Sequence, residues 1–470
     1  MLYEGTMFDP QAVRRFAGRT VLVIGAARSG LAAAELLLAL GARVILNDLK
    51  PRDALRDLPD TLLHQNCELC LGVPAEGLIE RCDFIIISPG IPLQTPFLLK
   101  AQRQGIPVMG ELAFASSCTT LDIIAVSGTN GKTTTVSLLG EILKQAGRVI
   151  HAAGNIGYPL SAAVLRAKPD DLLVAEVSSF QLETAGKFHS KAAALLNITP
   201  DHLDRHLTME TYIALKKSLF DRMDGADSAV LNYDDPTVAA MAPGIRARVT
   251  WFSRSGTAPH GAVLKEGKLA WLENGIARII CETGDLRIPG THNIENALAA
   301  AAMACCLSVP LPVIAYALKS FAGVEHRIEF VDQINDVRWL NDSKGTNPDS
   351  TIKAVESMTS PTVLIAGGYD KQVSFDALAA SIIRSRWIQH TILIGQTAEK
   401  IRIALDCAGY LKITHANSLE DAIQLAATLA QPGWNVLFSP ACASFDMFLD
   451  YEQRGRAFKF FVNLLKVQGK

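Results

Sequence analysis

Short apolar runs alternate with amphipathic stretches along most of the chain, which is typical of an α/β fold with parallel sheets. The runs are bounded by glycine, proline or polar residues and are too short for buried helices, so they predict strands. We expect strands at residues 21–25, 43–46, 84–88, 123–126, 172–177, 192–198, 337–340, 362–366, 391–394 and 435–438. Helical periodicity is clear at residues 31–40 and 136–145, each shortly after a strand.

The order of these elements predicts three α/β domains in the 470 residues. We expect a Rossmann-like N-terminal domain at residues 1–114, a central P-loop domain with a mostly parallel sheet at 115–323, and a C-terminal Rossmann-like αβ domain at 324–470. The most apolar stretch, residues 297–318, is interrupted by Pro310 and Pro312. It therefore predicts a buried helix followed by a turn, and not a membrane span.

A glycine loop with the sequence G-T-N-G-K-T-T-T follows the strand at 123–126 and precedes the helix at 136–145. This arrangement cradles nucleoside phosphates, because backbone amides face the oxygens, Lys132 reaches the terminal phosphates and the Thr133 hydroxyl can hold Mg²⁺. Val126 stands where the full pattern has its first glycine. An ordinary strand-to-helix turn is therefore the alternative to a phosphate loop.

A second glycine turn, G-A-A-R-S-G at residues 25–30, lies between the strand at 21–25 and the helix at 31–40. Asp48 follows the next strand, at the distance where an acid commonly meets a ribose hydroxyl. Ala27 replaces the middle glycine of a dinucleotide fingerprint and crowds a pyrophosphate in the usual pose. The turn predicts a unit that holds a nucleotide-bearing ligand, while a dehydrogenase and a purely structural turn remain alternatives. Gly90 lies in a tight turn after the strand at 84–88.

Charged residues interrupt the apolar pattern of the central domain at three places. Glu176 lies in a buried strand, where a carboxylate needs a cation such as Mg²⁺ or an ion-pair partner. Five ionisable residues crowd the loop after the strand at 192–198, a density that indicates a functional site: Asp201, His202, Asp204, Arg205 and His206. Lys216 lies on a helical pattern, which by itself favours an ordinary solvated lysine.

Two asparagines, Asn293 and Asn296, open an alanine-rich helical stretch. Three residues apart, they share one helix face and can contact a purine edge. Helix capping is the alternative explanation for Asn293.

The composition is that of a globular enzyme, with 49% hydrophobic and 20% charged residues. The net charge of −2 argues against a nucleic-acid-binding protein. Nine cysteines, an odd number, indicate reduced intracellular thiols, and Cys67 and Cys70 form a C-x-x-C without a second pair at zinc spacing. The first ten residues lack the pattern of a signal peptide, so we expect a soluble cytoplasmic protein.

The motifs of the central domain together resemble those of the Mur ligases, the ATP-dependent amino-acid ligases of peptidoglycan precursor synthesis. The resemblance rests on G-T-N-G-K-T-T, E-V-S-S-F-Q-L, N-I-T-P-D-H-L-D-R-H with Y-x-x-x-K, and T-H-N-x-x-N, in this order. It covers nearly the whole chain. The fold, activity and site residues that this resemblance implies are therefore expectations.

Three polar loops of the C-terminal domain resemble the D-glutamate-adding branch of this family. They are N-D-S-K-G-T-N at 341–347, G-G-Y-D-K-Q at 367–372 and S-P-A-C-A-S-F-D at 439–446, and Y-E-Q-R-G follows at 451–455. The D-N-P-R signature of the diaminopimelate- or lysine-adding members is absent. Tyr451 stands where some members have Phe. The loops follow strands of one sheet, so we expect them at one edge.

The resemblance implies a role for each candidate residue. Catalytic roles are implied for Lys132, Glu176, His202, Lys216 and Lys344. ATP contacts are implied for Gly128, Thr129, Asn130, Gly131, Lys132, Thr133, Thr134, Asn293, Asn296, Arg327 and Asp342, with His326 beside Arg327 at the domain junction. The UDP-substrate would contact Arg28, Ser29, Gly30, Asp48, Gly90, Asn155 and His202. D-glutamate would contact Lys344, Thr346, Lys371, Ser444 and Tyr451.

The resemblance further implies two Mg²⁺ ions, with Thr133, Glu176, His202 and a carbamylated Lys216 as ligands, so it overturns the solvated-lysine interpretation. The implied reaction joins D-glutamate to UDP-N-acetylmuramoyl-L-alanine through an acyl phosphate, at the expense of ATP. We expect a monomer whose last domain closes over ATP. The remaining alternatives are a nucleotide-dependent switch, an oxidoreductase based on residues 25–30, and a related ligase such as folylpolyglutamate synthase.

Overall fold

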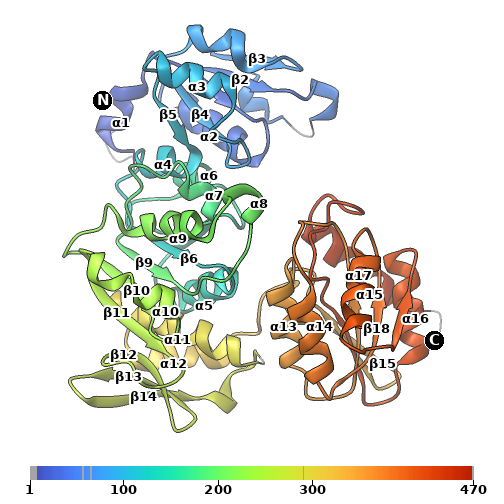
Figure 1. Cartoon of the computed structure of the whole chain (residues 1–470). Helices are drawn as coiled ribbons and strands as arrows, with labels where there is room; N and C mark the ends of the chain where they lie inside the picture. Colours follow the sequence, from blue (N-terminus) through green and yellow to red (C-terminus); the bar gives the residue numbers. More distant parts are fainter. Residues whose placement is uncertain (1–7, 56–57, 64–65, 289, 468–470) are drawn as a thin grey trace. The chain divides into compact units, whose positions relative to one another are not determined.

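The structure is a computed structural model that describes residues 8–55, 58–63, 66–288 and 290–467 (Figure 1). Within these residues the strands form sheets of five, nine and six strands, and most neighbouring strands are parallel. The α/β organisation predicted from the sequence is thus confirmed. Contacts divide the chain into two compact units. The first holds residues up to Ile198 with Thr208–Asp285 and Glu295–Lys319, and the second holds Thr199–Leu207, Leu286–Ile294 and the chain from Ser320 onward.

The N-terminal sheet is parallel and has the order β3-β2-β1-β4-β5. Its strands are β1 (Thr20–Ile24), β2 (Arg43–Asp48), β3 (Cys67–Leu71), β4 (Phe84–Ile87) and β5 (Val108–Gly110), and its helices are α1 (Pro10–Phe16), α2 (Arg28–Ala39), α3 (Pro96–Arg103) and α4 (Glu111–Ser116). Helix α2 begins three residues earlier than predicted, because Ala27 is the extended residue before it. Arg28, Ser29 and Gly30 therefore form the first turn of a helix and not a loop. The prediction that the chain has no signal peptide concerns its first ten residues. Of these, residues 1–7 lie outside the described part of the chain.

The nine-stranded sheet has the order β14-β13-β12-β11-β10-β9-β6-β8-β7. Its strands are β6 (Ile123–Ser127), β7 (Ile150–Gly154), β8 (Leu172–Glu176), β9 (Ala192–Leu195), β10 (Ser228–Asn232), β11 (Arg248–Ser253), β12 (Gly261–Lys265), β13 (Lys268–Glu273) and β14 (Ile276–Glu282). The helices of this region are α5 (Lys132–Gln145), α6 (Leu160–Arg166), α7 (Ser179–Leu182), α8 (Leu203–His206), α9 (Met209–Lys217), α10 (Pro236–Ala239), α11 (Thr291–Cys306) and α12 (Leu311–Ser320). The antiparallel strands β13 and β14 extend an otherwise parallel sheet, and the sequence analysis did not predict them.

The first two sheets share one hydrophobic core. Phe16 and Phe114 pack edge-to-face with ring centroids 5.3 Å apart, and the same cluster continues through Leu36 of α2 to Leu160 and Val164 of α6. Burial of these side chains stabilises the N-terminal and central sheets as one compact unit.

The apolar stretch at 297–318 contains the predicted buried helix and turn, and a second helix that was not predicted follows the turn. Helix α11 ends at Cys306, Ser308 turns the chain with a left-handed φ of 61°, and α12 begins at Leu311. Pro312 lies in the first turn of α12, where a missing N–H is tolerated. No helix among the described residues is long and apolar enough to cross a membrane.

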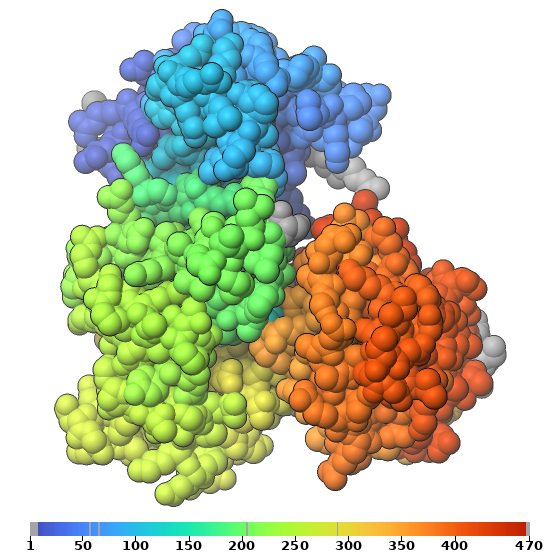
Figure 2. Space-filling model, in the orientation of Figure 1, coloured from blue at the N-terminus to red at the C-terminus, as the bar shows by residue number. Residues whose placement is uncertain are grey.

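The C-terminal sheet has the order β15-β16-β20-β17-β18-β19, with only β15 antiparallel to its neighbour. Its elements are β15 (Glu329–Ile334), β16 (Val337–Asn341), α13 (Pro348–Glu356), β17 (Thr362–Ala366), α14 (Asp376–Arg384), β18 (Ile388–Leu393), α15 (Ala398–Cys407), β19 (Ile413–His415), α16 (Leu419–Leu429), β20 (Asn435–Phe438) and α17 (Tyr451–Val467). Separate hydrophobic clusters cover its two faces. Figure 2 shows the surface of this domain in orange and red. Because β16, β20 and β17 are neighbours, the three polar loops meet at one edge, as predicted.

Candidate active site

The loop between β6 and α5 has the geometry of a phosphate-binding turn. Gly131 precedes α5 with a left-handed φ of 84°, and a Cβ there would lie 2.3 Å from Oδ1 of Asn296. Gly128 has a φ of 154°, and its Cβ would lie 3.0 Å from Leu196. Both positions therefore require glycine, and the loop leads directly into the N-terminus of α5, where a helix favours an anion. The helix begins at Lys132, earlier than the predicted Val136, so Lys132, Thr133 and Thr134 belong to its first turn.

Two lysine ammonium groups meet at this loop. Lys132 Nζ donates to the carbonyl oxygens of Gly128 and Thr129 at 2.9 and 2.8 Å, and Lys216 Nζ donates to the same Gly128 oxygen at 2.8 Å. Lys216 is 1% exposed, so the pattern-based expectation of a solvated lysine is wrong. Helix α9 turns this side chain inward, and amphipathic spacing alone does not show which face of a short helix meets a ligand.

Glu176 stands at the end of β8 and faces the first turn of α5. The Thr133 hydroxyl donates to its Oε2 at 2.6 Å, and Asn155 Nδ2 donates to its Oε1 at 2.8 Å. The carboxylate is 2% exposed. These bonds offset the cost of burying a charged group. They join Thr133 and Glu176, both predicted as Mg²⁺ ligands, to Asn155, which was predicted to contact the UDP-substrate.

Asn197 and Tyr212 contribute to the loop but were not assigned roles from the sequence. Asn197 accepts from the Asn130 amide at 2.9 Å and donates to the Asn130 carbonyl at 3.2 Å. The Tyr212 hydroxyl lies 3.1 Å from the Thr129 hydroxyl, and Lys216 lies over the Tyr212 ring. The signals were present, because Asn197 directly follows an apolar run and Tyr212 lies one helical turn before Lys216.

The N-terminal glycine turn is built differently. Asp48 accepts the Ala26 amide at 2.7 Å and the Lys50 amide at 2.9 Å, so it fixes the turn itself. A Cβ on Gly30 would lie 1.7 Å from the Gly25 carbonyl oxygen, which means that α2 packs directly on the end of β1. Arg28 is exposed at the start of α2, and Gly90 follows the adjacent strand β4. The candidate residues of this domain thus lie at or just after the carboxyl ends of the neighbouring strands β1, β2 and β4.

The ionisable loop after β9 belongs to the second compact unit. Asp201 accepts the His202 amide at 3.0 Å, and its Oδ2 lies 3.6 Å from His202 Nε2. Asn347 Nδ2 donates to the same Oδ2 at 3.2 Å. The first unit therefore brings together Lys132, Glu176 and Lys216, whereas His202 is described within the second.

Asn293 and Arg327 line one cavity of about 440 Å³ in the second unit. Arg327 also lies 3.5 Å from Asp342, which is fully buried and accepts the Ser439 hydroxyl at 2.7 Å. Burial raises the pKa of Asp342, and the nearby Arg327 guanidinium partly opposes this shift. Asn296, in contrast, contacts the phosphate loop of the first unit, where it accepts the Thr135 hydroxyl at 3.4 Å.

The loops assigned to D-glutamate form one connected group. Lys344 Nζ donates to the Tyr451 hydroxyl at 3.0 Å, and the Thr346 amide donates to the Lys344 carbonyl at 2.9 Å. Tyr369, two residues before Lys371, donates its amide to Ala443, next to Ser444.

Arg454 was missed, although the sequence motif Y-E-Q-R-G contains it. It is 0% exposed and donates to Ser343 and to the carbonyls of Cys442 and Ala443 at 2.7 to 3.1 Å. Burial lowers its pKa to about 10, and the carbonyl contacts tie the first polar loop to the third.

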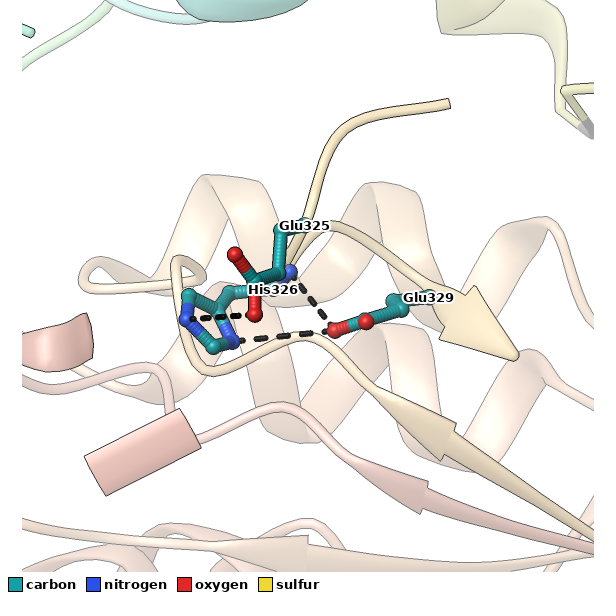
Figure 3. Close-up of side chains that lie close together, drawn as sticks. All are labelled: Glu325, His326 and Glu329. Carbon is teal, nitrogen blue, oxygen red and sulfur yellow. Dashed lines mark hydrogen bonds and ion pairs between the residues drawn. The ribbon is translucent and has the colours of Figure 1, made fainter. Parts of the chain in front are cut away.

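His326 lies between two carboxylates, as Figure 3 shows. Its Nδ1 is 3.6 Å from Glu329 and its Nε2 is 3.8 Å from Glu325. Among the described residues, these are the only three His, Cys, Asp or Glu side chains that lie together at metal-ligand spacing, but Lys459 donates to both carboxylates and occupies the place of a cation. Cys67 and Cys70 are not part of any such group, and all nine cysteines are free thiols.

Three sequence profiles match the chain in consecutive order. They are the Mur ligase MurD-like N-terminal domain at residues 19–110, the Mur ligase middle domain at 126–304 and the Mur ligase glutamate ligase domain at 326–442. The chain is 45% identical over 444 residues to the UDP-N-acetylmuramoylalanine–D-glutamate ligase of Thermoanaerobacter sp. strain X514, covering 94% of this chain and 97% of that protein. The chain belongs to the Mur ligase family. It is therefore an enzyme of the ATP-dependent amide ligases that serve peptidoglycan synthesis.

Further relatives agree with this family. The Mur ligase of the same name from Pelotomaculum thermopropionicum is 46% identical over 455 residues, which cover 97% of this chain and 99% of that protein. The solved UDP-N-acetylmuramate–alanine ligase of Thermotoga maritima matches with a TM-score of 0.60 and 16% identity over 96% of this chain and all of that chain. The MurF ligase of Thermotoga maritima in complex with ADP matches with a TM-score of 0.59 and 16% identity, covering 97% of each chain. These structural matches show the fold alone, and they agree with the predicted three-domain α/β architecture.

The residues around Glu176 fit a divalent cation. A hydroxyl and a carboxylate oxygen 2.6 Å apart at the N-terminus of α5 are hard oxygen donors of the type that Mg²⁺ prefers. Glu176 is buried, and its hydrogen-bond donors Thr133 and Asn155 are neutral, so a cation would neutralise it.

Proposed function

We propose that this Mur ligase joins D-glutamate to UDP-N-acetylmuramoyl-L-alanine with the conversion of ATP to ADP and phosphate. The names of its 45–46% identical relatives support the substrates. The observation that carries the chemistry is the convergence of Lys132 and Lys216 on the Gly128 carbonyl, beside the paired Thr133 and Glu176. We place the reaction in the cytoplasm, where ATP is available, and we propose a monomer as the active species.

The central problem of this reaction is that a carboxylate is a poor electrophile and reacts with an amine only to form a salt. The L-alanyl carboxylate first attacks the γ-phosphorus of ATP, which breaks the bond to ADP and gives an acyl phosphate. The free amine of D-glutamate then attacks the acyl carbon, and the tetrahedral intermediate expels phosphate. Both steps concentrate negative charge, so fixed cations contribute the main stabilisation.

The phosphate loop supplies these fixed charges. Lys132 and the α5 amides would hold the β- and γ-phosphates, because Lys132 Nζ lies at the carbonyls of the loop that leads into this helix. Thr133, Glu176, His202 and the modified Lys216 would hold two Mg²⁺ ions, which neutralise charge on the transferring phosphoryl group. Asn155 would keep Glu176 oriented, because it binds the oxygen that Thr133 does not.

Carbamylation of Lys216 is the part of this proposal with the clearest chemical reason. Its buried Nζ donates to the Gly128 carbonyl beside the Nζ of Lys132, at the loop where the phosphates would bind. Reaction of the neutral amine with CO₂ gives an anion that can bind metal. We expect Lys216→Arg to fold normally and to lose nearly all turnover, and carbon-13 bicarbonate to label the wild-type protein alone. Labelling of both proteins, or normal turnover of the variant, would reject this role.

The lysines and hydroxyls of the C-terminal loops would bind the amino acid. Lys344, Lys371 and Ser444 suit two carboxylates, and Tyr451 positions Lys344 through its hydroxyl. Arg28, Ser29, Gly30, Asp48 and Gly90 would bind the uridine diphosphate. Because ligands on separate domains must meet, turnover requires closure of the C-terminal domain.

Phosphate release from ATP tests the proposed function directly. Release should require both UDP-N-acetylmuramoyl-L-alanine and D-glutamate, and neither NAD nor L-glutamate should substitute. Release without the sugar nucleotide would favour a nucleotide-dependent switch. A response to NAD would favour the oxidoreductase alternative.

A further inference from the structure

The segment Thr199–Leu207, which carries His202, packs with the C-terminal part of the chain although it follows a strand of the nine-stranded sheet. Its helix α8 has only four residues, too few to be stable alone. His202 before it and Leu207 after it have left-handed φ values of 53° and 67°, which are unfavourable for residues other than glycine. This conformation therefore depends on contacts with the rest of its unit.

Asn347 makes such a contact while it caps α13. Its Oδ1 accepts the Ser350 amide at 2.8 Å, which fixes the orientation of the carboxamide. The Nδ2 consequently faces Asp201 and donates to its Oδ2 at 3.2 Å. Both side chains are more than nine-tenths buried, with exposed fractions of 8% and 7%. The bond is thus shielded from water and joins two segments far apart in the sequence.

Asp201 passes this constraint to His202. Its Oδ1 accepts the His202 amide at 3.0 Å, and its Oδ2 lies 3.6 Å from His202 Nε2. On the other side, Asn347 ends the tight loop that begins at Asn341 and carries Lys344 and Thr346. One short chain of contacts therefore connects the amino-acid loop to the imidazole.

We propose that Asn347 is a positioning residue that couples the D-glutamate loop to His202 through Asp201. The effect of this coupling on kcat rests on the proposed function. Its effect on the structure of residues 199–207 does not. When the loop of Lys344 moves with α13, Asn347 carries Asp201 and the backbone of His202 with it. Amino-acid binding and imidazole placement then occur as one event.

The variant Asn347→Asp isolates this role. A carboxylate still accepts the Ser350 amide and caps α13, but it cannot donate to Asp201 and repels it. We expect amide hydrogen exchange in residues 199–207 of the ligand-free and metal-free protein to accelerate at least about tenfold, while exchange in α13 stays unchanged. We also expect kcat to fall about tenfold with the KM for ATP nearly constant.

Two further variants control this experiment. The exchange of donor and acceptor, Asp201→Asn with Asn347→Asp, allows a bond of reversed direction and should restore the slow exchange of residues 199–207. Ser418→Ala removes the equivalent cap of α16, where Ser418 accepts the Asp421 amide. This variant should lower the melting temperature but leave kcat and the hydrogen exchange of residues 199–207 unchanged.

Unchanged exchange in residues 199–207, unchanged kcat, or failure of the double variant to restore protection would overturn the proposal. If the wild-type protein proved inactive with both substrates, the proposed function would fail, while the exchange measurement would still decide whether Asn347 holds this segment.

Discussion

Two strand–glycine–helix turns occur in this chain, and they use the same backbone plan for different tasks. At the first, after β1, Asp48 binds the turn's own amide and Gly30 lets α2 pack on the Gly25 carbonyl. At the second, after β6, Lys132 and Lys216 converge on a carbonyl and Glu176 faces the first helical turn. A helix N-terminus alone provides a place for an anion. The half-buried Lys132, the buried Lys216 and the Glu176 carboxylate add the charges that phosphoryl transfer requires.

The largest effect should follow from removing the charge of Glu176. Glu176→Gln keeps the size of the side chain and the contact with Asn155, but it removes the anion that would bind Mg²⁺. We expect kcat to fall about 10²- to 10³-fold, because fixed charges contribute this much to transfer reactions. Binding of the UDP-substrate should be retained. If kcat of the variant stayed within about tenfold of the wild-type value, turnover would not depend on the charge of Glu176.

The N-terminal turn should respond to a steric change instead. Gly30→Ala places a Cβ 1.7 Å from the Gly25 oxygen, so α2 must shift. We expect a loss of about 3 kcal/mol in the free energy of unfolding and loss of UDP-substrate binding, while ATP analogues still bind the other turn. Gly77→Ala is the matched control, because a Cβ there meets nothing within 4 Å. Equal effects of both variants in denaturant unfolding would contradict the packing argument.

A smaller effect is expected for Asp48→Asn. The amide oxygen can still accept from Ala26, but the bond loses its charge, which is worth about 1 to 2 kcal/mol. The KM for the UDP-substrate should rise about tenfold with kcat unchanged, as measured by steady-state kinetics. A fall in kcat with constant KM would mean that this turn takes part in the chemistry and is not only a binding element.

The smallest effect concerns Glu111, which is 1% exposed in α4 beside the core that joins the two sheets. Burial raises its pKa, so the native state keeps the proton to a higher pH than the unfolded state. The stability it contributes is therefore complete below the unfolded-state pKa and is lost as the pH rises through the native-state pKa. Glu111→Gln should raise the melting temperature at about pH 8 and change it little at about pH 4. A larger rise in melting temperature at the lower pH than at the higher pH would contradict the raised pKa of Glu111.

The strands that the sequence predicted are continuous apolar runs, but it missed the parallel strands β3, β5, β7, β10, β11, β12 and β19 and the antiparallel strand β15. It also missed β13 and β14, where alternation is weak, although Asn274-Gly275 adopts the left-handed φ values of 53° and 77° that a tight hairpin turn favours. Recognition of that dipeptide would have identified the hairpin. Helix starts were placed too late at Arg28 and Lys132, because a first turn exposes polar side chains and has no apolar periodicity.

Site residues were predicted where a motif carries them and missed where only tertiary contacts define them. Lys216 shows the difference most clearly, because its helix pattern indicated solvent and the structure buries it. Arg454, Asn197 and Asn347 act by bonding to loops distant in the sequence. No local periodicity encodes such pairings. The assigned contacts of individual residues with ATP, the UDP-substrate and D-glutamate remain predictions.

The most direct test of the account follows the substrate's own oxygen. UDP-N-acetylmuramoyl-L-alanine labelled with oxygen-18 in its carboxylate is incubated with ATP, Mg²⁺ and D-glutamate, and the released phosphate is analysed by mass spectrometry. An acyl phosphate requires that one carboxylate oxygen leaves with phosphorus, so we predict one labelled oxygen in each phosphate formed with product. Unlabelled phosphate, released at the rate of peptide formation, would contradict activation of the carboxylate at the phosphate loop.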